Sequence, residues 1–279
     1  MTIAITGATG HLGRLAIAAL KARGKKPLAL VRDPAKATDL GAETRAFDYK
    51  ATSTLAPALA GVSTLVLVSS NDFDDRVGQH RNVIAAAKAA GVGRILYTSI
   101  LRADSSPMLL AADHKGTEEA VRDSGLGFTF LRNGWYTENH TGSLGGAIAA
   151  GALIGSAGEG RFSTASRADY AEAIAVTAIG EGHDGKTYEL AGDGSHSYAE
   201  LAAEVSRVTG KAIPYNDLPP DAYAGILQSF GLPAGFAHVL ADSDVQAGKG
   251  ALFDESRTLS RLIGRPTTPW QHTVAAALA

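Results

Sequence analysis

Short apolar runs and longer amphipathic stretches alternate along the first half of the chain. The apolar runs have the length of buried strands, and the stretches between them carry apolar residues at helical spacing. Strands that alternate with helices indicate a parallel sheet with helices on both faces. The predicted strands are residues 3–6, 27–31, 44–47, 64–68, 94–98 and 128–131, and the predicted helices include 12–21, 77–90 and 114–124.

The pattern loosens after Asn133 and then resumes. We interpret the Gly-rich stretch 145–157 as a helix end and a loop, followed by a helix at 168–179, a strand at 187–190 and four helical stretches from Ser197 onward. We therefore expect residues 1–133, completed by part of 150–192, to form the sheet domain. Residues 134–279 then form a smaller, mostly helical lobe over the carboxyl edge of the sheet.

The composition narrows the classes of ligand. The 279 residues are 45% hydrophobic and 19% charged, with a net charge of −2, so the strong positive field of a nucleic-acid or anionic-membrane binder is missing. We expect a small-molecule partner. Without cysteine, any redox chemistry must come from a bound cofactor or a metal. The first residues do not resemble a secretory signal, and a cytoplasmic location is the default expectation.

Three glycines follow the first predicted strand directly and open the first predicted helix. Gly7 permits a tight turn, Gly10 lets the backbone approach a pyrophosphate, and Gly13 lets the helix pack closely on the strand. Main-chain N–H groups at the helix N-terminus then hold the phosphates. The sequence thus predicts a Rossmann-type dinucleotide-binding domain; the alternative is a plain turn between strand and helix.

The cofactor preference depends on the end of the second predicted strand. Folds that bind NAD usually place an acid there for the ribose 2′-hydroxyl, whereas this chain has Arg32, followed by Asp33 and Pro34. Arginine favours a 2′-phosphate, and Asp33-Pro34 is typical of an N-cap and first helical position. We therefore predict NADPH as cofactor; the alternative is a solvated surface arginine.

Polar residues also follow the later strands. Asp48 and Tyr49 close the third strand, where they could contact adenine or form a plain turn. Because the carboxyl ends of parallel strands share one edge, small polar side chains at the fourth and fifth strands suit ribose and nicotinamide contacts, although each could also be a helix cap. These candidates are Ser69, Ser70, Asn71, Thr98 and Ser99.

The usual acid of a dehydrogenase is missing from the sequence. Typical short-chain dehydrogenases place a lysine four residues after a tyrosine to lower the pKa of the phenol, and none of the eight tyrosines here has that lysine. A reductase without it needs an acceptor that requires little acid assistance, and quinones fit. The scattered histidines do not indicate a metal site, and no Gly-x-Ser-x-Gly segment indicates a hydrolase.

Over nearly its whole length the chain resembles the type 2 NAD(P)H:quinone oxidoreductases, which are atypical short-chain dehydrogenases of the NmrA-like group. The opening segment is shared by the broad superfamily and indicates only the cofactor. The segment around Asn133 and the later segments are more specific to this group. The matching segments are AITGATG at 4–10, VR at 31–32, QHRNVI at 79–84, YTS at 97–99, LRNGWY at 131–136, ASRADY at 165–170, YELAGD at 188–193 and LIGRPT at 262–267.

The resemblance implies two-electron reduction of quinones by NADPH, without flavin or metal, in a cleft between the sheet domain and the smaller lobe. It implies that Asn133, Trp135 and Tyr136 border nicotinamide and substrate, with Asn133 and Tyr136 as catalytic candidates. The two aromatic side chains could equally be core of the second lobe. The resemblance also assigns phosphate and adenosine contacts to Gly7, Thr9, Gly10, His11, Leu12 and Arg32.

The segment from His114 to Glu118 leaves two interpretations open. His114 is a further catalytic candidate that could relay a proton near pH 7, or it is a helical residue bonded to the backbone. Lys115, which departs from the pattern of the relatives, is most simply a surface charge.

Other functions remain open on the sequence alone. The acceptor could be a triarylmethane dye, an activated ketone or an imine, because relatives in the same group reduce such compounds. The chain could also be a non-catalytic NADP(H) redox sensor of the NmrA type. A homodimer is left open.

Overall fold

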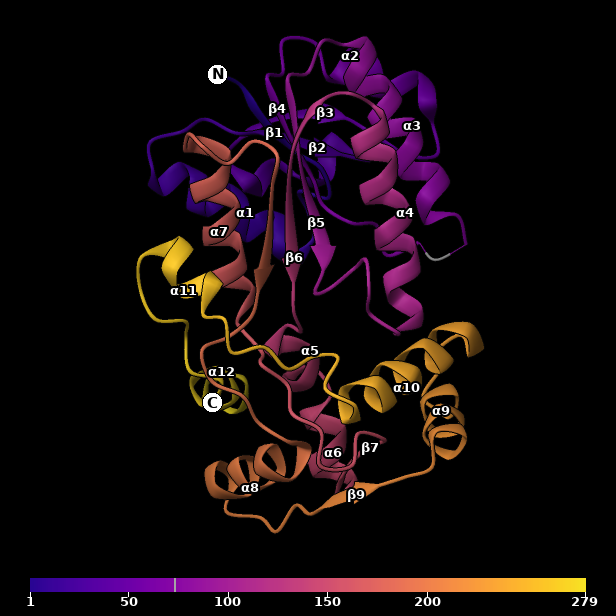
Figure 1. The fold of residues 1–279 in the computed structure, drawn as a ribbon. Helices are drawn as coiled ribbons and strands as arrows, with labels where there is room; N and C mark the ends of the chain where they lie inside the picture. Colours follow the sequence, from indigo (N-terminus) through magenta and orange to yellow (C-terminus); the bar gives the residue numbers. More distant parts are fainter. Residues whose placement is uncertain (73) are drawn as a thin grey trace. The chain divides into compact units, whose positions relative to one another are not determined.

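The computed structural model describes residues 1–72 and 74–279. The chain forms two compact units (Figure 1). The first, which we call the sheet unit, comprises Met1–Ala103, Asp113–Asn133 and Arg167–Glu189. The second, the helical unit, comprises Asp104–Ala112, Gly134–Ser166 and Leu190–Ala279. Among the described residues, no helix combines the length and the apolar character needed to cross a membrane.

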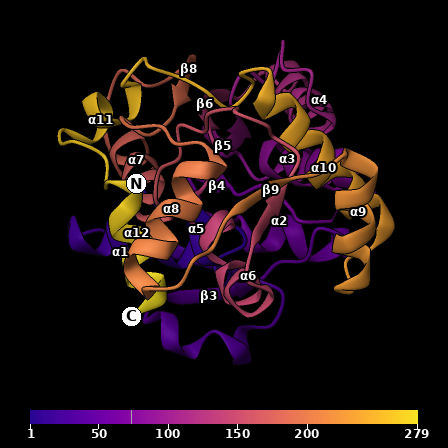
Figure 2. The ribbon, with the colours of Figure 1, turned by 90° about the horizontal axis from the view of Figure 1, so that it is seen from below.

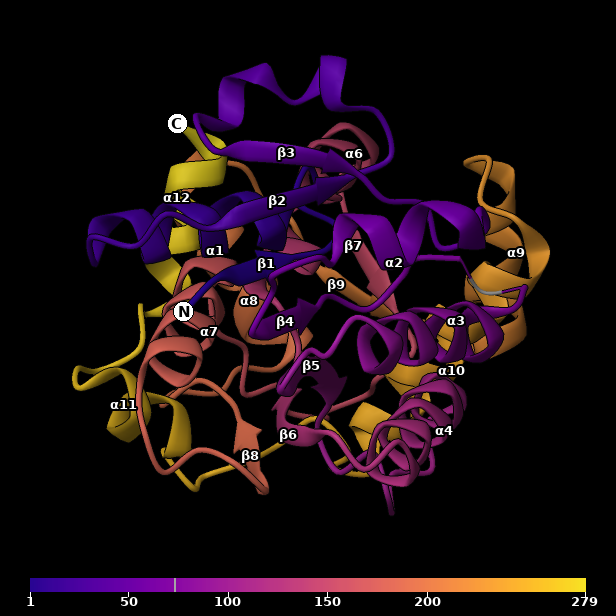
Figure 3. The same ribbon diagram turned by 90° about the horizontal axis from the view of Figure 1, so that it is seen from above.

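A seven-stranded sheet organises the sheet unit. Its order is β3-β2-β1-β4-β5-β6-β8, and the pairs from β3 to β6 are parallel (Figure 3). The direction of winding reverses between β1 and β4, and ligands of such sheets bind beyond the carboxyl ends of the strands at that point. The predicted doubly wound fold is confirmed. The strands are β1 (Ile3–Ile5), β2 (Leu28–Val31), β3 (Glu43–Ala46), β4 (Thr64–Leu67), β5 (Arg94–Ile100), β6 (Gly127–Asn133) and β8 (Lys186–Leu190).

Helices cover both faces of this sheet. On one face lie α1 (His11–Ala22) and α7 (Arg167–Ile179); on the other lie α2 (Leu55–Ala58), α3 (Arg76–Ala89) and α4 (Leu109–Asp123) (Figures 1 and 3). Short 3-10 helices occupy Pro34–Lys36, Thr38–Leu40 and Thr52–Thr54. Strands β1, β2 and β4 are buried along their whole length, as expected for a sheet covered on both sides.

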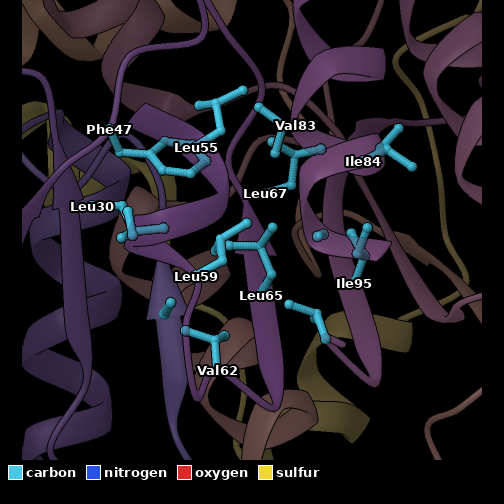
Figure 4. Close-up of a cluster of buried hydrophobic side chains, with 14 of the residues drawn as sticks. Leu30, Phe47, Leu55, Leu59, Val62, Leu65, Leu67, Val83, Ile84 and Ile95 are labelled. Carbon is cyan, nitrogen blue, oxygen red and sulfur yellow. The ribbon is translucent and has the colours of Figure 1, made fainter. Parts of the chain in front are cut away.

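The core beneath α2 and α3 consists of aliphatic side chains and a few aromatic rings (Figure 4). Burying a Leu, Ile or Val side chain stabilises the fold by about 1.5–3 kcal/mol each, so this cluster fixes both helices on the sheet. Its labelled members are Leu30, Phe47, Leu55, Leu59, Val62, Leu65, Leu67, Val83, Ile84 and Ile95.

Two strands and one helix extend at least two residues beyond a predicted end. β5 and β6 pair over seven residues, from Arg94 opposite Gly127 to Ile100 opposite Asn133. The prediction stopped earlier because Ser99 and Arg132 are polar. In the structure both side chains bind Glu118 of α4, so the strands continue through them. Helix α4 in turn begins at Leu109, before the predicted start.

The helical unit corrects two predictions. Residues 145–157 are not a helix end and a loop, because they contain most of α6 (Leu144–Ala150) and all of β7 (Leu153–Gly155). Between Ser197 and Ala279, all of which is described, the chain forms five helices rather than four, and one strand. These are α8 (Tyr198–Thr209), β9 (Tyr215–Asp217), α9 (Pro220–Ser229), α10 (Ala234–Gly248), α11 (Thr258–Ile263) and α12 (Trp270–Leu278).

The elements that the sequence did not predict are all short. β7 pairs in parallel with β9, with Leu153 opposite Tyr215, and three-residue strands become stable only through such a distant partner. Helix α11 has six residues, too few to show a helical period. Helices α9 and α10 pack side by side (Figure 2), and α5 (Thr137–Thr141) completes the unit.

The turn between β1 and α1 depends on two glycines. Gly7 has φ +58°, a left-handed conformation that favours glycine. At Gly13, a Cβ atom would lie 2.3 Å from the carbonyl oxygen of Gly7 and 2.9 Å from Cα of Ala8. Only a residue without a side chain lets α1 approach the turn this closely, which confirms the packing predicted for Gly13.

Two buried histidines share a hydrogen bond in the helical unit. His140 Nδ1 lies 3.2 Å from His196 Nε2, and Phe162, Tyr198 and Trp270 contribute aromatic rings around the pair. Burial lowers the pKa of His140 well below its ordinary value and that of His196 to about 3. Both rings are therefore neutral at pH 7.

We predict that Gly13→Ala lowers the free energy of unfolding by about 1–3 kcal/mol, because the added methyl group forces α1 away from the turn. Gly145→Ala is the matched control: among the described residues no atom would contact the new methyl group there, so stability should stay equal or rise slightly. Urea denaturation of both variants measures the difference. A Gly13→Ala variant as stable as the parent would show that α1 tolerates a shift.

We also predict that stability falls as the pH drops below 6.5. The unfolded chain takes up a proton on His196 near its ordinary pKa of 6.5, whereas the folded chain does so only near pH 3. Between these values the free energy of unfolding therefore decreases by up to about 1.4 kcal/mol for each unit by which the pH falls. Urea titrations at pH 7.5, 6 and 5 give the slope, and His196→Asn should reduce it. Equal slopes in the His196 variant and the parent would contradict the assignment.

Candidate cofactor-binding site

The β1–α1 turn presents main-chain groups at the carboxyl edge of the sheet. Gly7, Thr9, Gly10 and His11 are exposed, whereas Leu12 is buried beneath them. Helix α1 begins after Gly10, which has no side chain to cap it, and its first turn carries no acidic residue. The first N–H groups of a helix have no partner within the helix, and together with the helix dipole they attract anions. This turn therefore fits a diphosphate.

Arg32 follows the last residue of β2 and is exposed. It forms no hydrogen bond or ion pair with any part of the chain that the structure describes. The neighbouring Asp33 caps the short helix Pro34–Lys36 by accepting a hydrogen bond from Ala35 N (3.0 Å), as the sequence predicted. Of the two charged residues, only the arginine is thus left to bind a ligand.

Asp48 and Tyr49, which follow β3, lie in a turn, one of the two interpretations that the sequence left open. Asp48 Oδ1 accepts a hydrogen bond from Lys50 N (3.0 Å), and Asp48 N donates to Thr54 Oγ1 (3.1 Å). The hydroxyl of Tyr49 donates to Thr6 Oγ1 at 2.5 Å, and burial raises its pKa. Tyr49 therefore links the ends of β3 and β1 as a neutral phenol.

The ends of β4 and β5 are joined by a hydrogen bond from Ser69 N to Thr98 Oγ1 (2.9 Å). Ser70 N donates to His80 Nε2 (3.1 Å), and Asn71 is exposed. Ser99 behaves differently, because successive strand residues point to opposite faces: its hydroxyl donates to the buried Glu118 at 2.7 Å. The structure thus brings Ser69 and Thr98 together and directs the Ser99 side chain away from them.

A buried ionic network holds the end of β6. Arg132 donates to both carboxylate oxygens of Glu118, at 2.8 and 2.7 Å, and to Glu189 at 2.8 Å. Burial alone would lower the pKa of Arg132, but these two carboxylates raise it above its ordinary value. The network fixes the strand immediately before Asn133, which is itself buried. The sequence did not predict it, because nothing local links residues 118, 132 and 189.

His114 lies in α4, and its Nδ1 is 2.9 Å from the hydroxyl of Tyr97. Burial, reinforced by the charge of Arg76, lowers its pKa well below the ordinary value, and burial raises the pKa of Tyr97 to about 12. Both groups are therefore neutral at pH 7, which favours the interpretation of His114 as a structural residue of the helix over that of a proton relay. Its hydrogen bond is to a side chain, not to the backbone. Lys115 is exposed, as predicted.

Trp135 and Tyr136 belong to the helical unit, whereas Asn133 ends the sheet unit. The backbone at these two aromatic residues pairs with Ala165: Ala165 N donates to Trp135 O (3.2 Å), and Tyr136 and Ala165 form a parallel bridge. Both side chains are half-buried and not enclosed in the core. Part of each aromatic surface thus remains open to a ligand.

One charged pair beside the turn was missed by the sequence analysis. Arg14 Nε donates to the carbonyl oxygen of Thr9 (3.0 Å), and its Nη1 forms an ion pair with Asp39. A basic residue directly after the third glycine was the available signal. Within residues 1–72 and 74–279, no group of three or more histidine or acidic side chains is arranged to hold a metal ion.

Comparison with known proteins assigns this chain to a family. The family model described as NAD(P)H-binding matches residues 7–178. Quinone oxidoreductase 2 of Escherichia coli is 50% identical over 278 residues, 98% of this chain and 97% of the relative. The crystal structure of an NADPH-dependent quinone oxidoreductase from Escherichia coli in complex with NADPH superposes with a TM-score of 0.95 and 49% identity, covering 99% of this chain and 100% of that chain.

The triphenylmethane reductase of Citrobacter sp. in complex with NADP(H) is more distant. It superposes with a TM-score of 0.92 and 36% identity, over 99% of each chain. The glycine turn between β1 and α1, the sheet order and the full-length similarity agree with one another. This chain therefore belongs to the NAD(P)H-binding family, and the type 2 quinone oxidoreductases are its relatives within it.

Proposed function

We propose that this protein reduces quinones with NADPH by direct hydride transfer, without flavin or metal. The observation that carries the proposal is the similarity over nearly the full chain to the Escherichia coli quinone oxidoreductase, whose crystal structure contains NADPH. The β1–α1 turn supplies the matching physical feature, since its exposed glycines and uncapped helix N-terminus suit a dinucleotide diphosphate.

The proposed cofactor contacts follow the carboxyl edge of the sheet. Arg32 binds the 2′-phosphate, since it is exposed and is not engaged elsewhere in the described chain. For Ser99, only the main chain remains for a ligand, because its hydroxyl binds Glu118. The diphosphate lies against the turn from Gly7 to Leu12 and is held by its main-chain N–H groups other than that of Gly10, which donates to the carbonyl oxygen of Gly7. The side chains or main chain of Asp48, Ser69, Ser70, Asn71 and Thr98 line the adenosine and nicotinamide ends.

In the proposed reaction, bound NADPH supplies a hydride, and the quinone takes up this hydride and one proton to become a hydroquinone. The side chains of the protein orient the quinone and the nicotinamide and do not act as an acid. No tyrosine has a lysine four residues later, and Tyr97 and His114 stay neutral near pH 7. The product oxyanion is aromatic and stable enough to take its proton from water. Asn133, Trp135 and Tyr136 are proposed to hold the flat acceptor by amide, stacking and hydroxyl contacts.

A second acceptor class has support of its own. The Citrobacter protein, named a triphenylmethane reductase, shares 36% of its residues with this chain over nearly the full length. A cationic triphenylmethane dye resembles a quinone in that it is conjugated and accepts a hydride without acid assistance. The site described above does not separate the two acceptors.

We predict that purified protein without added flavin oxidises NADPH when 1,4-benzoquinone is supplied, and that kcat/KM for quinones exceeds that for triphenylmethane dyes. Absorbance at the NADPH band, corrected for the uncatalysed reaction, measures the rate. Turnover with dyes alone would assign the second acceptor class. NADP⁺ binding without turnover of any acceptor would identify a redox sensor in place of an enzyme.

We predict that Arg32→Ala weakens NADPH binding by about 1.5–3 kcal/mol and leaves NADH binding nearly unchanged, because a charge-assisted contact to the 2′-phosphate is lost. Calorimetric titration with both cofactors gives the two dissociation constants. Arg207→Ala is the control, since Arg207 is exposed in α8 and pairs with Glu204 of the same helix. Equal weakening of NADPH and NADH would show that Arg32 does not recognise the 2′-phosphate.

A further inference from the structure

The Arg14–Asp39 ion pair lies between the phosphate-binding turn and the segment that follows Arg32. Arg14 extends from the first turns of α1, and its Nε–H group binds the carbonyl oxygen of Thr9 at 3.0 Å. Its Nη1 pairs with Asp39, which lies seven residues after Arg32 in the helix Thr38–Leu40. One guanidinium group thus touches both segments that are proposed to surround the adenosine.

The segment after Arg32 is fixed against α1 at a second point. Lys21 Nζ donates to the carbonyl oxygens of Gly41 (2.9 Å) and Leu40 (3.3 Å), and the side chain of Leu40 is buried. Arg14 is therefore not needed to hold this segment in place. Its pairing with Asp39 is a contact between two charged side chains at the surface.

The ion pair is easily exchanged. The Arg14 and Asp39 side chains are 40% and 62% exposed, and exposed ion pairs contribute little to stability because water screens them. A guanidinium has five N–H donors, and the contacts with Thr9 and Asp39 use one on each of two nitrogens. A phosphate group carries more negative charge than a carboxylate, and like a carboxylate it can accept two parallel hydrogen bonds from a guanidinium group.

We propose that Arg14 is a second determinant of 2′-phosphate recognition, and that Asp39 competes with this phosphate for the Arg14 guanidinium. The inference rests on the proposed function, since it takes the 2′-phosphate to lie at Arg32. Asp39 then acts as an internal competitor: it occupies Arg14 in the free protein and lowers the preference for NADPH over NADH.

The proposal gives the two partners opposite effects. Arg14→Ala removes a contact with the 2′-phosphate and weakens NADPH binding. Asp39→Asn removes the competing charge and strengthens NADPH binding. If the pair only anchored the segment after Arg32, both substitutions would break the same contact and would change the binding of both cofactors in the same direction.

The test is calorimetric titration of the full chain and its variants with NADPH and with NADH. We expect Arg14→Ala to weaken NADPH about tenfold and Asp39→Asn to tighten it about threefold, with NADH changed less than about twofold in both. Lys21→Met is the matched control, because it removes the other tie of the same segment, and it should leave the ratio of the two dissociation constants unchanged. Thermal melting of each variant confirms that it is folded.

Three results would overturn the inference: weaker NADPH binding in Asp39→Asn, equal weakening of both cofactors in Arg14→Ala, or a Lys21→Met variant that changes the ratio as much as Arg14→Ala does. Its failure is distinguishable from that of the proposed function. If Arg32→Ala discriminates between the cofactors and Arg14→Ala does not, only the role of Arg14 is lost. If Arg32→Ala does not discriminate either, the placement of the 2′-phosphate is wrong.

Discussion

The structure depends first on the close approach of α1 to the turn after β1. A single side-chain carbon at Gly13 would collide with the carbonyl oxygen of Gly7, so the contact is purely one of backbone against backbone. This packing brings the helix N-terminus to the carboxyl edge of the sheet, where the winding of the strands reverses. The partial positive charge of the helix end is then directed at the place where a dinucleotide diphosphate is expected.

Charged residues have two different roles around this edge. Arg132 is buried and satisfied by two carboxylates, and removing one partner of such a group leaves an uncompensated buried charge. It therefore fixes the end of β6 and the backbone leading to Asn133. Arg14 and Asp39 make a similar pair at the surface, where the contact is weak and exchangeable. An arginine–carboxylate pair thus fixes the backbone where it is buried, as at Arg132. Where it is exposed, as at Arg14, we propose that the arginine is available to bind a ligand.

The phenol of Tyr97 and the imidazole of His114 are buried and hydrogen-bonded to each other. Burial raises the pKa of the Tyr97 phenol and lowers the pKa of the His114 imidazole, so both groups are neutral around pH 7. The fold is shared with reductases of differently named acceptors, and fold alone does not select the acceptor. The aromatic residues Trp135 and Tyr136 after Asn133 are half-buried, and we propose that they contact the acceptor.

The sequence by itself determined the doubly wound sheet, the glycine turn at Gly7–Gly13 and the cap at Asp33, because each arises from hydrophobic periodicity or from interactions between near neighbours in the chain. Only the tertiary structure decided that Ser99 binds Glu118, that His114 is too buried to titrate near pH 7, that β7 pairs with β9 and that Arg14 pairs with Asp39. The three contacts join residues at least 19 positions apart in the chain, and the state of His114 depends on its burial. Local patterns carry no information about such distant partners.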